Sequence, residues 1–323
     1  GEKECLAAFG LCAVIYGVFG FVCYSKCTLT SRNIKIRDGY LVVAACWITA
    51  CFFGAFPYYI ADNSLSFIQC IFESTAGITT TGSSILTQTA SANSLLLFKA
   101  ICHWIGGMGI LVLVVSILPN LGIGGQTIAD AETPTPRIEK VTNRISDTAM
   151  ILYVMYIAFS ILEFVLLIAS KQLSVFDALL TTLSTISTGG FLSHDVGIMY
   201  YNSVYVELII TVFSILVAVT FNLYFYLVNR RLKEIKNNTE LKTFIAIILI
   251  STAVISINLF TSGIYGSIPT AIRHSLTQVV SFSTTSGFKF ADFMTWPSLS
   301  KTILFMLMMM GGCAASTAGG IKL

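Results

Sequence analysis

Long apolar stretches recur along the 323-residue chain, with short polar connectors between them. A helix needs about 20 mainly apolar residues to cross the hydrocarbon core of a bilayer. Seven stretches reach that length. They predict membrane-spanning helices at 6–25, 39–60, 95–118, 148–170, 203–228, 243–263 and 298 to about 318.

Three further apolar segments are shorter than a span requires, at about 14 to 16 residues. They cover 65–78, 173–187 and 268–283, and they follow the second, fourth and sixth predicted spans. This length favours helices that enter the membrane and return on the same side. The order span, short helix, loop, span therefore occurs three times after one leading helix, which predicts an all-α polytopic membrane protein with internal repeats.

Composition and charge agree with this class. Hydrophobic residues make up 55% of the chain and charged residues only 11%, whereas a soluble domain has about a quarter charged residues. A net charge of +3 without a basic stripe excludes nucleic acid as a partner. Most lysines and arginines lie in the connectors before the second, fourth and sixth spans. Such connectors are expected in the cytoplasm, with the short helices entering from the opposite face.

Each short helix is followed by a similar loop of hydroxyl residues, a small residue and a glycine. A dehydrated cation needs a shell of carbonyl and hydroxyl oxygens, and glycine can turn successive carbonyls toward one axis. The negative ends of the helix dipoles favour a cation at the same place. One such loop is weak evidence, but three in register predict an ion pathway. The candidate residues are Thr79, Thr80, Thr81, Gly82, Ser187, Thr188, Gly189, Gly190, Thr284, Thr285, Ser286 and Gly287.

Ionisable residues in the apolar segments are candidates for function, because an unpaired charge in a membrane is costly. Glu73 and Asp177 are expected either to attract cations or to hold the loops from behind. Arg273 and His274 are expected to pair with carboxylates, and His103 is expected to pack.

Enzymatic chemistry is excluded by the motifs. The chain has no GxSxG, no HExxH and no pair of intramembrane aspartates, so a nucleophile lacks a base. The nine cysteines form no zinc-spaced cluster and are interpreted as small apolar residues. We therefore expect no cofactor.

Several stretches together resemble the Trk/Ktr/HKT superfamily of potassium transporters and, within it, the TrkH/TrkG branch. These stretches are FESTAGITTTGSS (72–84), HWIGGMGILVLVVSILPNLGIGG (103–125), AETPTP (131–136), STISTGGFLSHD (184–195) and GGCAASTAGGIK (311–322). The resemblance implies fused helix, pore loop, helix repeats around a pseudo-fourfold cation pore, with three repeats present here. It implies that the twelve loop residues form a potassium filter, and glycine at the last position of each loop matches the potassium-favouring pattern.

The last predicted span contains a glycine-rich run, and each glycine costs a helix interior roughly 0.5 to 1 kcal/mol. The run predicts an irregular segment, with close packing of small residues as the alternative. The resemblance implies that this segment is an intramembrane gate below the filter. Its candidate residues are Gly311, Gly312, Ser316, Thr317, Gly319 and Gly320.

The resemblance also implies the setting of the protein. It implies potassium uptake across the bacterial cytoplasmic (inner) membrane, a homodimer, and a cytosolic nucleotide-binding regulatory ring similar to TrkA. Sodium-coupled or mixed sodium and potassium transport is an alternative. A non-conducting truncated remnant is another, because a fourth repeat and the first helix of an N-terminal hairpin are not found in the sequence.

On this basis the chain divides into six parts. They are a leading helix (1–30), a first pore repeat (31–125), a cytoplasmic connector (126–146), a second pore repeat (147–230), a second connector (231–242) and a third pore repeat that ends in the gating segment (243–323).

Overall fold

The computed structural model describes residues 2–26, 36–62, 64–86, 91–109, 145–314 and 316–322. All regular elements in these ranges are helices. Residues 27–35 and 110–144 lie outside the described residues. They include most of the predicted connector at 126–146, the AETPTP motif, the end of the third predicted span and most of the stretch at 103–125. The chain forms two compact units, residues 1–153 and 154–323.

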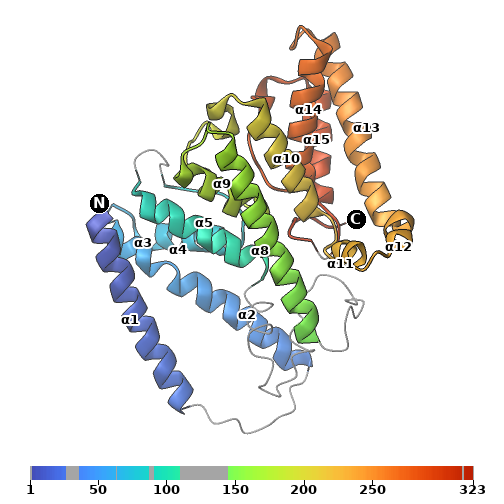
Figure 1. Ribbon diagram of the computed structural model, residues 1–323. Helices are drawn as coiled ribbons and strands as arrows, with labels where there is room; N and C mark the ends of the chain where they lie inside the picture. Colours follow the sequence, from blue (N-terminus) through green and yellow to red (C-terminus); the bar gives the residue numbers. More distant parts are fainter. Residues whose placement is uncertain are drawn as a thin grey trace. The chain divides into compact units, whose positions relative to one another are not determined.

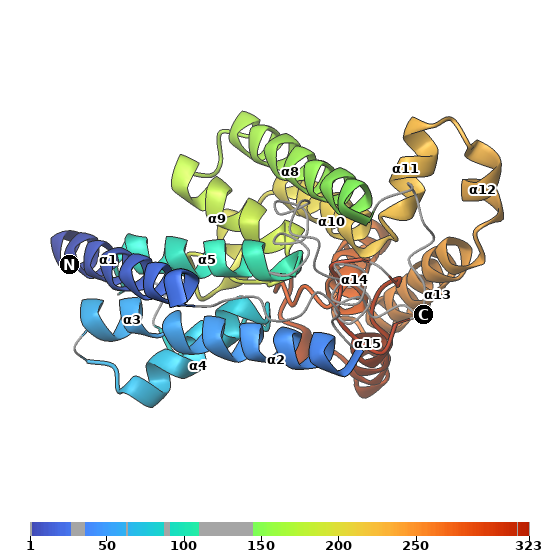
Figure 2. The same cartoon turned by 90° about the horizontal axis from the view of Figure 1, so that it is seen from below.

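The first unit contains helices α1 to α5, with α4 packed on both α2 and α5, and α1 packed on both α3 and α5. Figure 2 shows α1 beside α5. Tyr58, Cys70 and Leu95 are buried in its core. The bounds are α1 Glu2–Lys26, α2 Ile36–Phe53, α3 Phe56–Ala61, α4 Phe67–Ile78 and α5 Asn93–Gly107.

The second unit begins within α8 and is centred on three packed helices near its end. Helices α13, α14 and α15 pack on one another and appear side by side in orange to red in Figure 1. Leu259, Val279, Leu304 and Trp296 are buried in this core. The bounds are α8 Ile145–Ala169, α9 Val175–Ile186, η1 Gly197–Tyr201, α10 Val204–Ala218, α11 Asn222–Val228, α12 Leu232–Asn237, α13 Thr239–Thr261, α14 Ile268–Ser283, η2 Phe293–Thr295 and α15 Ser298–Met310.

Four helical segments within the described ranges are long and apolar enough to cross a membrane: Cys5–Lys26, Tyr40–Ala61, Leu152–Ala169 and Thr239–Thr261. Between 11% and 33% of each apolar window is buried inside the protein. Side chains such as Leu6, Phe21, Ile161 and Ile257 are therefore exposed, as expected for helices whose outer faces contact lipid. The protein is a multi-pass membrane protein.

The three short helices form where the sequence predicts them, as α4, α9 and α14. Each begins at a serine whose hydroxyl accepts the amide hydrogen three residues later: Ser66, Ser174 and Ser267. Such a cap satisfies one of the amide groups that a helix start leaves without a partner. Each short helix packs on the helix that follows its loop, α5, α10 or α15.

Three predicted spans differ from the prediction. The span at 203–228 is two helices, because α10 ends at Ala218 and α11 begins at Asn222. The span from 298 ends at Met310, where Gly311 adopts a φ of 75°. The span at 39–60 is interrupted after Phe53. At this interruption a Cβ on Gly54 would lie 2.3 Å from the Ser74 hydroxyl oxygen, so α4 packs closely against the break.

Candidate functional site: three loops and a glycine-rich segment

The loops after α4, α9 and α14 have the same backbone conformation. Their second residues, Thr80, Thr188 and Thr285, have φ values of 54°, 54° and 55°. The glycines at the fourth position have φ values of 77°, 67° and 74° (Gly82, Gly190 and Gly287). A positive φ is unusual for a β-branched residue such as threonine, so its occurrence at one position of three loops marks a shared and demanding geometry.

Backbone hydrogen bonds follow the same offsets in all three loops. The amide of the first residue donates to the carbonyl four residues earlier, and that of the second donates to the carbonyl three residues earlier. The amide of the third residue donates to the carbonyl five residues earlier: Thr81 to Ala76, Gly189 to Ser184 and Ser286 to Ser281, at 2.8–3.0 Å. Each loop is therefore fixed to the last turn of its short helix.

The second and third loops contact each other within the second unit. A Cβ on Gly190 would lie only 1.9 Å from the backbone oxygen of Ser286 and 3.3 Å from the carbonyl carbon of Gly287. A Cβ on Gly287 would meet no described atom within 4 Å, so this glycine borders open space. Gly82 belongs to the first unit, and its convergence with the other two glycines stays a prediction.

The described residues of the glycine-rich segment, 311–314 and 316–320, form no helix. The chain then folds back against the end of α15. The amide of Ile321 donates to the carbonyl of Met309 at 3.1 Å. A Cβ on Gly311 would lie 2.1 Å from the carbonyl oxygen of Gly319, so this return requires glycine.

The same segment occupies the break after α10. The amides of Cys313 and Thr317 donate to the carbonyls of Ala218 and Val217, at 2.9 and 3.2 Å. The last carbonyls of a helix have no partner within it, so the segment satisfies two groups that the end of α10 leaves open. This accounts for the interruption of the span predicted at 203–228.

Two of the left-handed threonines join this segment to the loops. The hydroxyl of Thr188 donates to the carbonyl of Thr317 at 2.9 Å. The hydroxyl of Thr285 accepts from the amide of Gly319 at 2.6 Å. The candidate gating segment and two of the candidate filter loops are thus directly hydrogen-bonded.

Glu73 and Asp177 both lie behind their loops. Glu73 is fully buried and pairs with Lys99 at 2.5 Å. Asp177 accepts from the hydroxyls of Ser174 and Ser193, at 2.8 and 2.5 Å. Both carboxylates hold loop residues.

Tyr201 lies next to this second arrangement, with its hydroxyl 3.4 Å from that of Ser193. Burial raises the pKa of Tyr201 to about 12, so the phenol keeps its proton at neutral pH.

The other ionisable candidates do not all have the partners expected from the sequence. Arg273 pairs with Glu207, with Nε 3.1 Å from Oε2, as expected for a cation in an apolar segment. His274 instead stacks on Tyr265 with ring centroids 4.9 Å apart, and the ion pairs found within the described ranges do not include it. His103 and Glu163 are fully buried.

Comparison with known proteins decides the family. The family model TrkH, described as a cation transport protein, matches residues 8–323. The chain belongs to the TrkH family. Members of this family are transporters and not enzymes.

Individual TrkH-family relatives match most of the chain. The Trk system potassium uptake protein TrkH of Halomonas elongata is 36% identical over 298 residues, which cover 90% of this chain and 61% of the relative. TrkG of Escherichia coli is 32% identical over 327 residues, which cover 99% of this chain and 67% of the relative. The chain thus spans about three fifths of the length of the first relative.

A solved TrkH structure has the same fold. The crystal structure of the potassium transporter TrkH from Vibrio parahaemolyticus matches with a TM-score of 0.84 at 33% identity. The match covers 98% of this chain and 65% of that one.

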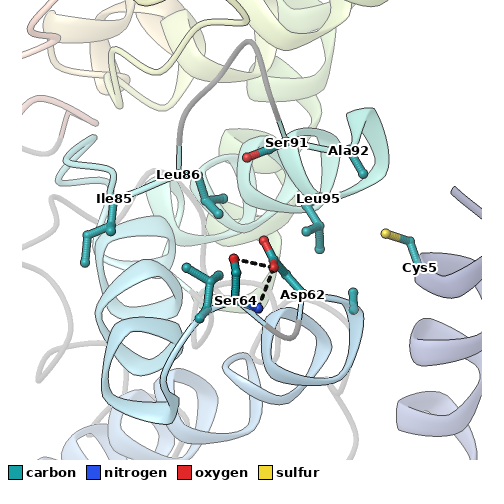
Figure 3. Close-up of a pocket in the computed structure, with 10 residues that line it drawn as sticks. Cys5, Asp62, Ser64, Ile85, Leu86, Ser91, Ala92 and Leu95 are labelled. Carbon is teal, nitrogen blue, oxygen red and sulfur yellow. Dashed lines mark hydrogen bonds between the residues drawn. The ribbon is translucent and has the colours of Figure 1, made fainter. Parts of the chain in front are cut away.

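A pocket of about 460 Å³ in this TrkH-family chain lies beside the end of the first loop (Figure 3). Ile85 and Leu86 line it together with Asp62, whose carboxylate accepts two hydrogen bonds from Ser64. None of the twelve candidate filter residues lines this pocket, so it is separate from the candidate filter.

Two residues that support the candidate site, Gln278 and Glu240, were not identified from the sequence. Lys99 is a charged residue in an apolar segment, which marks it as a candidate, but its role was not predicted. Gln278 and Lys99 contact the backbone just after a loop. Glu240 accepts from the amide of Ala314 at 2.5 Å and so holds the glycine-rich segment. The recurring position of Glu73 and Gln278, nine residues before a loop glycine, is the sequence signal that could have identified Gln278.

Proposed function

We propose that the protein takes up potassium across the cytoplasmic membrane of a bacterium. The loops at 79–82, 187–190 and 284–287 form three sides of its ion filter. The shared loop conformation carries this proposal, since the positive φ values at the second and fourth positions turn backbone carbonyls in the same manner in each loop. Relatives named as Trk system potassium uptake proteins support potassium as the ion.

The segment at 311–320 is proposed as the gate. Its hydrogen bonds to Thr188 and Thr285 support this role, because a change in the conformation of the segment would alter contacts with two loops at once. Its hydrogen bonds to the ends of α10 and α15 support this role as well, because they fix the segment in one defined arrangement. The domain boundaries, the homodimer and the TrkA-like ring remain predictions from the family resemblance.

Growth and ion uptake test the proposed function. Cells that lack their own potassium uptake systems and express the whole gene are expected to grow at low potassium and to take up rubidium. Sodium in excess should compete weakly. Strong sodium competition would favour the sodium-transporting alternative, and no uptake with protein present in the membrane would favour a non-conducting remnant.

A further inference from the structure

Glu73 and Lys99 form a buried ion pair at the backbone that leaves the first loop. Lys99 Nζ lies 2.5 Å from a carboxylate oxygen of Glu73 and donates to the carbonyl of Ser83 at 2.8 Å. Glu73 also accepts from the amides of Ile85 and Leu86. Both charged side chains are inaccessible to solvent.

Gln278 makes the corresponding bonds after the third loop with one neutral side chain. Its Oε1 accepts from the amides of Phe290 and Ala291, at 3.2 and 3.3 Å. Its Nε2 donates to the carbonyl of Phe288 at 3.3 Å.

The two arrangements agree residue by residue. Glu73 and Gln278 each lie nine residues before the last glycine of their loop, Gly82 or Gly287. In both cases the acceptor binds the amides three and four residues after that glycine. In both cases the donor binds the carbonyl one residue after it. In the first repeat, Glu73 therefore takes the role of the acceptor oxygen of the Gln278 side-chain amide. Lys99 takes the role of its donor nitrogen.

Stability alone does not explain a buried ion pair at this place. Apolar replacement of both partners of such a pair is often neutral or stabilising, because burying two charges is costly. The pair does, however, bind three backbone groups directly after the first loop: the carbonyl of Ser83 and the amides of Ile85 and Leu86.

We propose that Glu73 and Lys99 are positioning residues for ion selectivity, which together do for the first loop what Gln278 does for the third. This inference rests on the proposed function. The residues touch no ion; they act by holding the backbone from Ser83 to Leu86.

The glutamine arrangement supplies a rescue variant. Glu73→Gln with Lys99→Met gives the first repeat one side-chain amide, at the position equivalent to that of Gln278 in the third repeat. This double variant is expected to keep the potassium-to-sodium uptake ratio within about twofold of wild type, since the acceptor and the donor are both restored.

The matched apolar variant is Glu73→Leu with Lys99→Met. It is expected to reach the membrane in normal amounts and to lose selectivity roughly tenfold, a factor equivalent to about 1.4 kcal/mol. Glu207→Leu with Arg273→Met is the control. This pair joins α10 to α14, and its removal is expected to leave selectivity unchanged.

Wild-type selectivity in the apolar variant, or lost selectivity in the glutamine variant, would overturn the proposal. If the apolar variant fails to reach the membrane, the single variant Lys99→Met is measured in its place. Unchanged selectivity in that variant would also overturn the proposal. Absence of potassium uptake by the wild-type protein would instead refute the proposed function.

Discussion

Gly190 is required by two features of the backbone. Its φ of 67° is left-handed, a conformation that costs an L-residue roughly 1–2 kcal/mol. In addition, a Cβ would overlap the backbone oxygen of Ser286 in the neighbouring loop. The second feature concerns the contact between two loops and can be separated from the first.

Gly190→Ala is therefore expected to displace the third loop and lower the potassium-to-sodium uptake ratio. Gly263→Ala is the matched control, since Gly263 has a φ of 71° but no described atom within 4 Å of a built Cβ. Both variants carry the same backbone strain, and only the first forces two loops apart. Equal selectivity in the two variants would show that the contact does not matter.

Thr285 provides a second test at the scale of single residues. Thr285→Val keeps the β-branched shape and removes the acceptor for the amide of Gly319. A hydrogen bond contributes about 1 kcal/mol, so rubidium flux without a regulatory partner is expected to rise about fivefold.

Thr302→Val is the control for that experiment, because Thr302 is exposed on α15 and bonds within its own helix. If rubidium flux is the same in both valine variants, the hydrogen bond between Thr285 and Gly319 does not restrain the gate.

The helices show what a sequence can and cannot predict. The three short helices were predictable because their apolar lengths and following glycines are local features. The break of 203–228 was not, because Val219 to Phe221 carry no helix-breaking residue. The break depends on bonds from Cys313 and Thr317, about a hundred residues away. The pairing of Lys99 with Glu73 likewise joins two helices across 26 positions.

The candidate gating segment at 311–320 can be tested by a deletion. Deleting residues 316–318 removes Thr317, and with it the bond from Thr188 and the bond to the carbonyl of Val217 at the end of α10. Permeation is expected to increase without a regulatory partner or nucleotide, measured as rubidium flux per protein in the membrane. Unaltered flux would leave these glycines as packing residues and place the gate elsewhere.

Across the whole molecule, the same arrangement of short helix and loop occurs three times, and different side chains hold each loop in place. Serine-capped short helices end in loops of one conformation, and each loop is held from behind by different side chains. Glu73 with Lys99, Asp177 with Ser193, and Gln278 serve the three loops in turn. In the proposed filter, such different supports would allow each side to be tuned separately.

A crystal structure of the full-length protein grown in rubidium distinguishes one shared filter from three separate loops. Anomalous density for rubidium is expected within coordination distance of backbone oxygens from all three loops, 79–82, 187–190 and 284–287. Rubidium bound only elsewhere, or at one loop with the others remote from it, would show that the three loops do not form one filter.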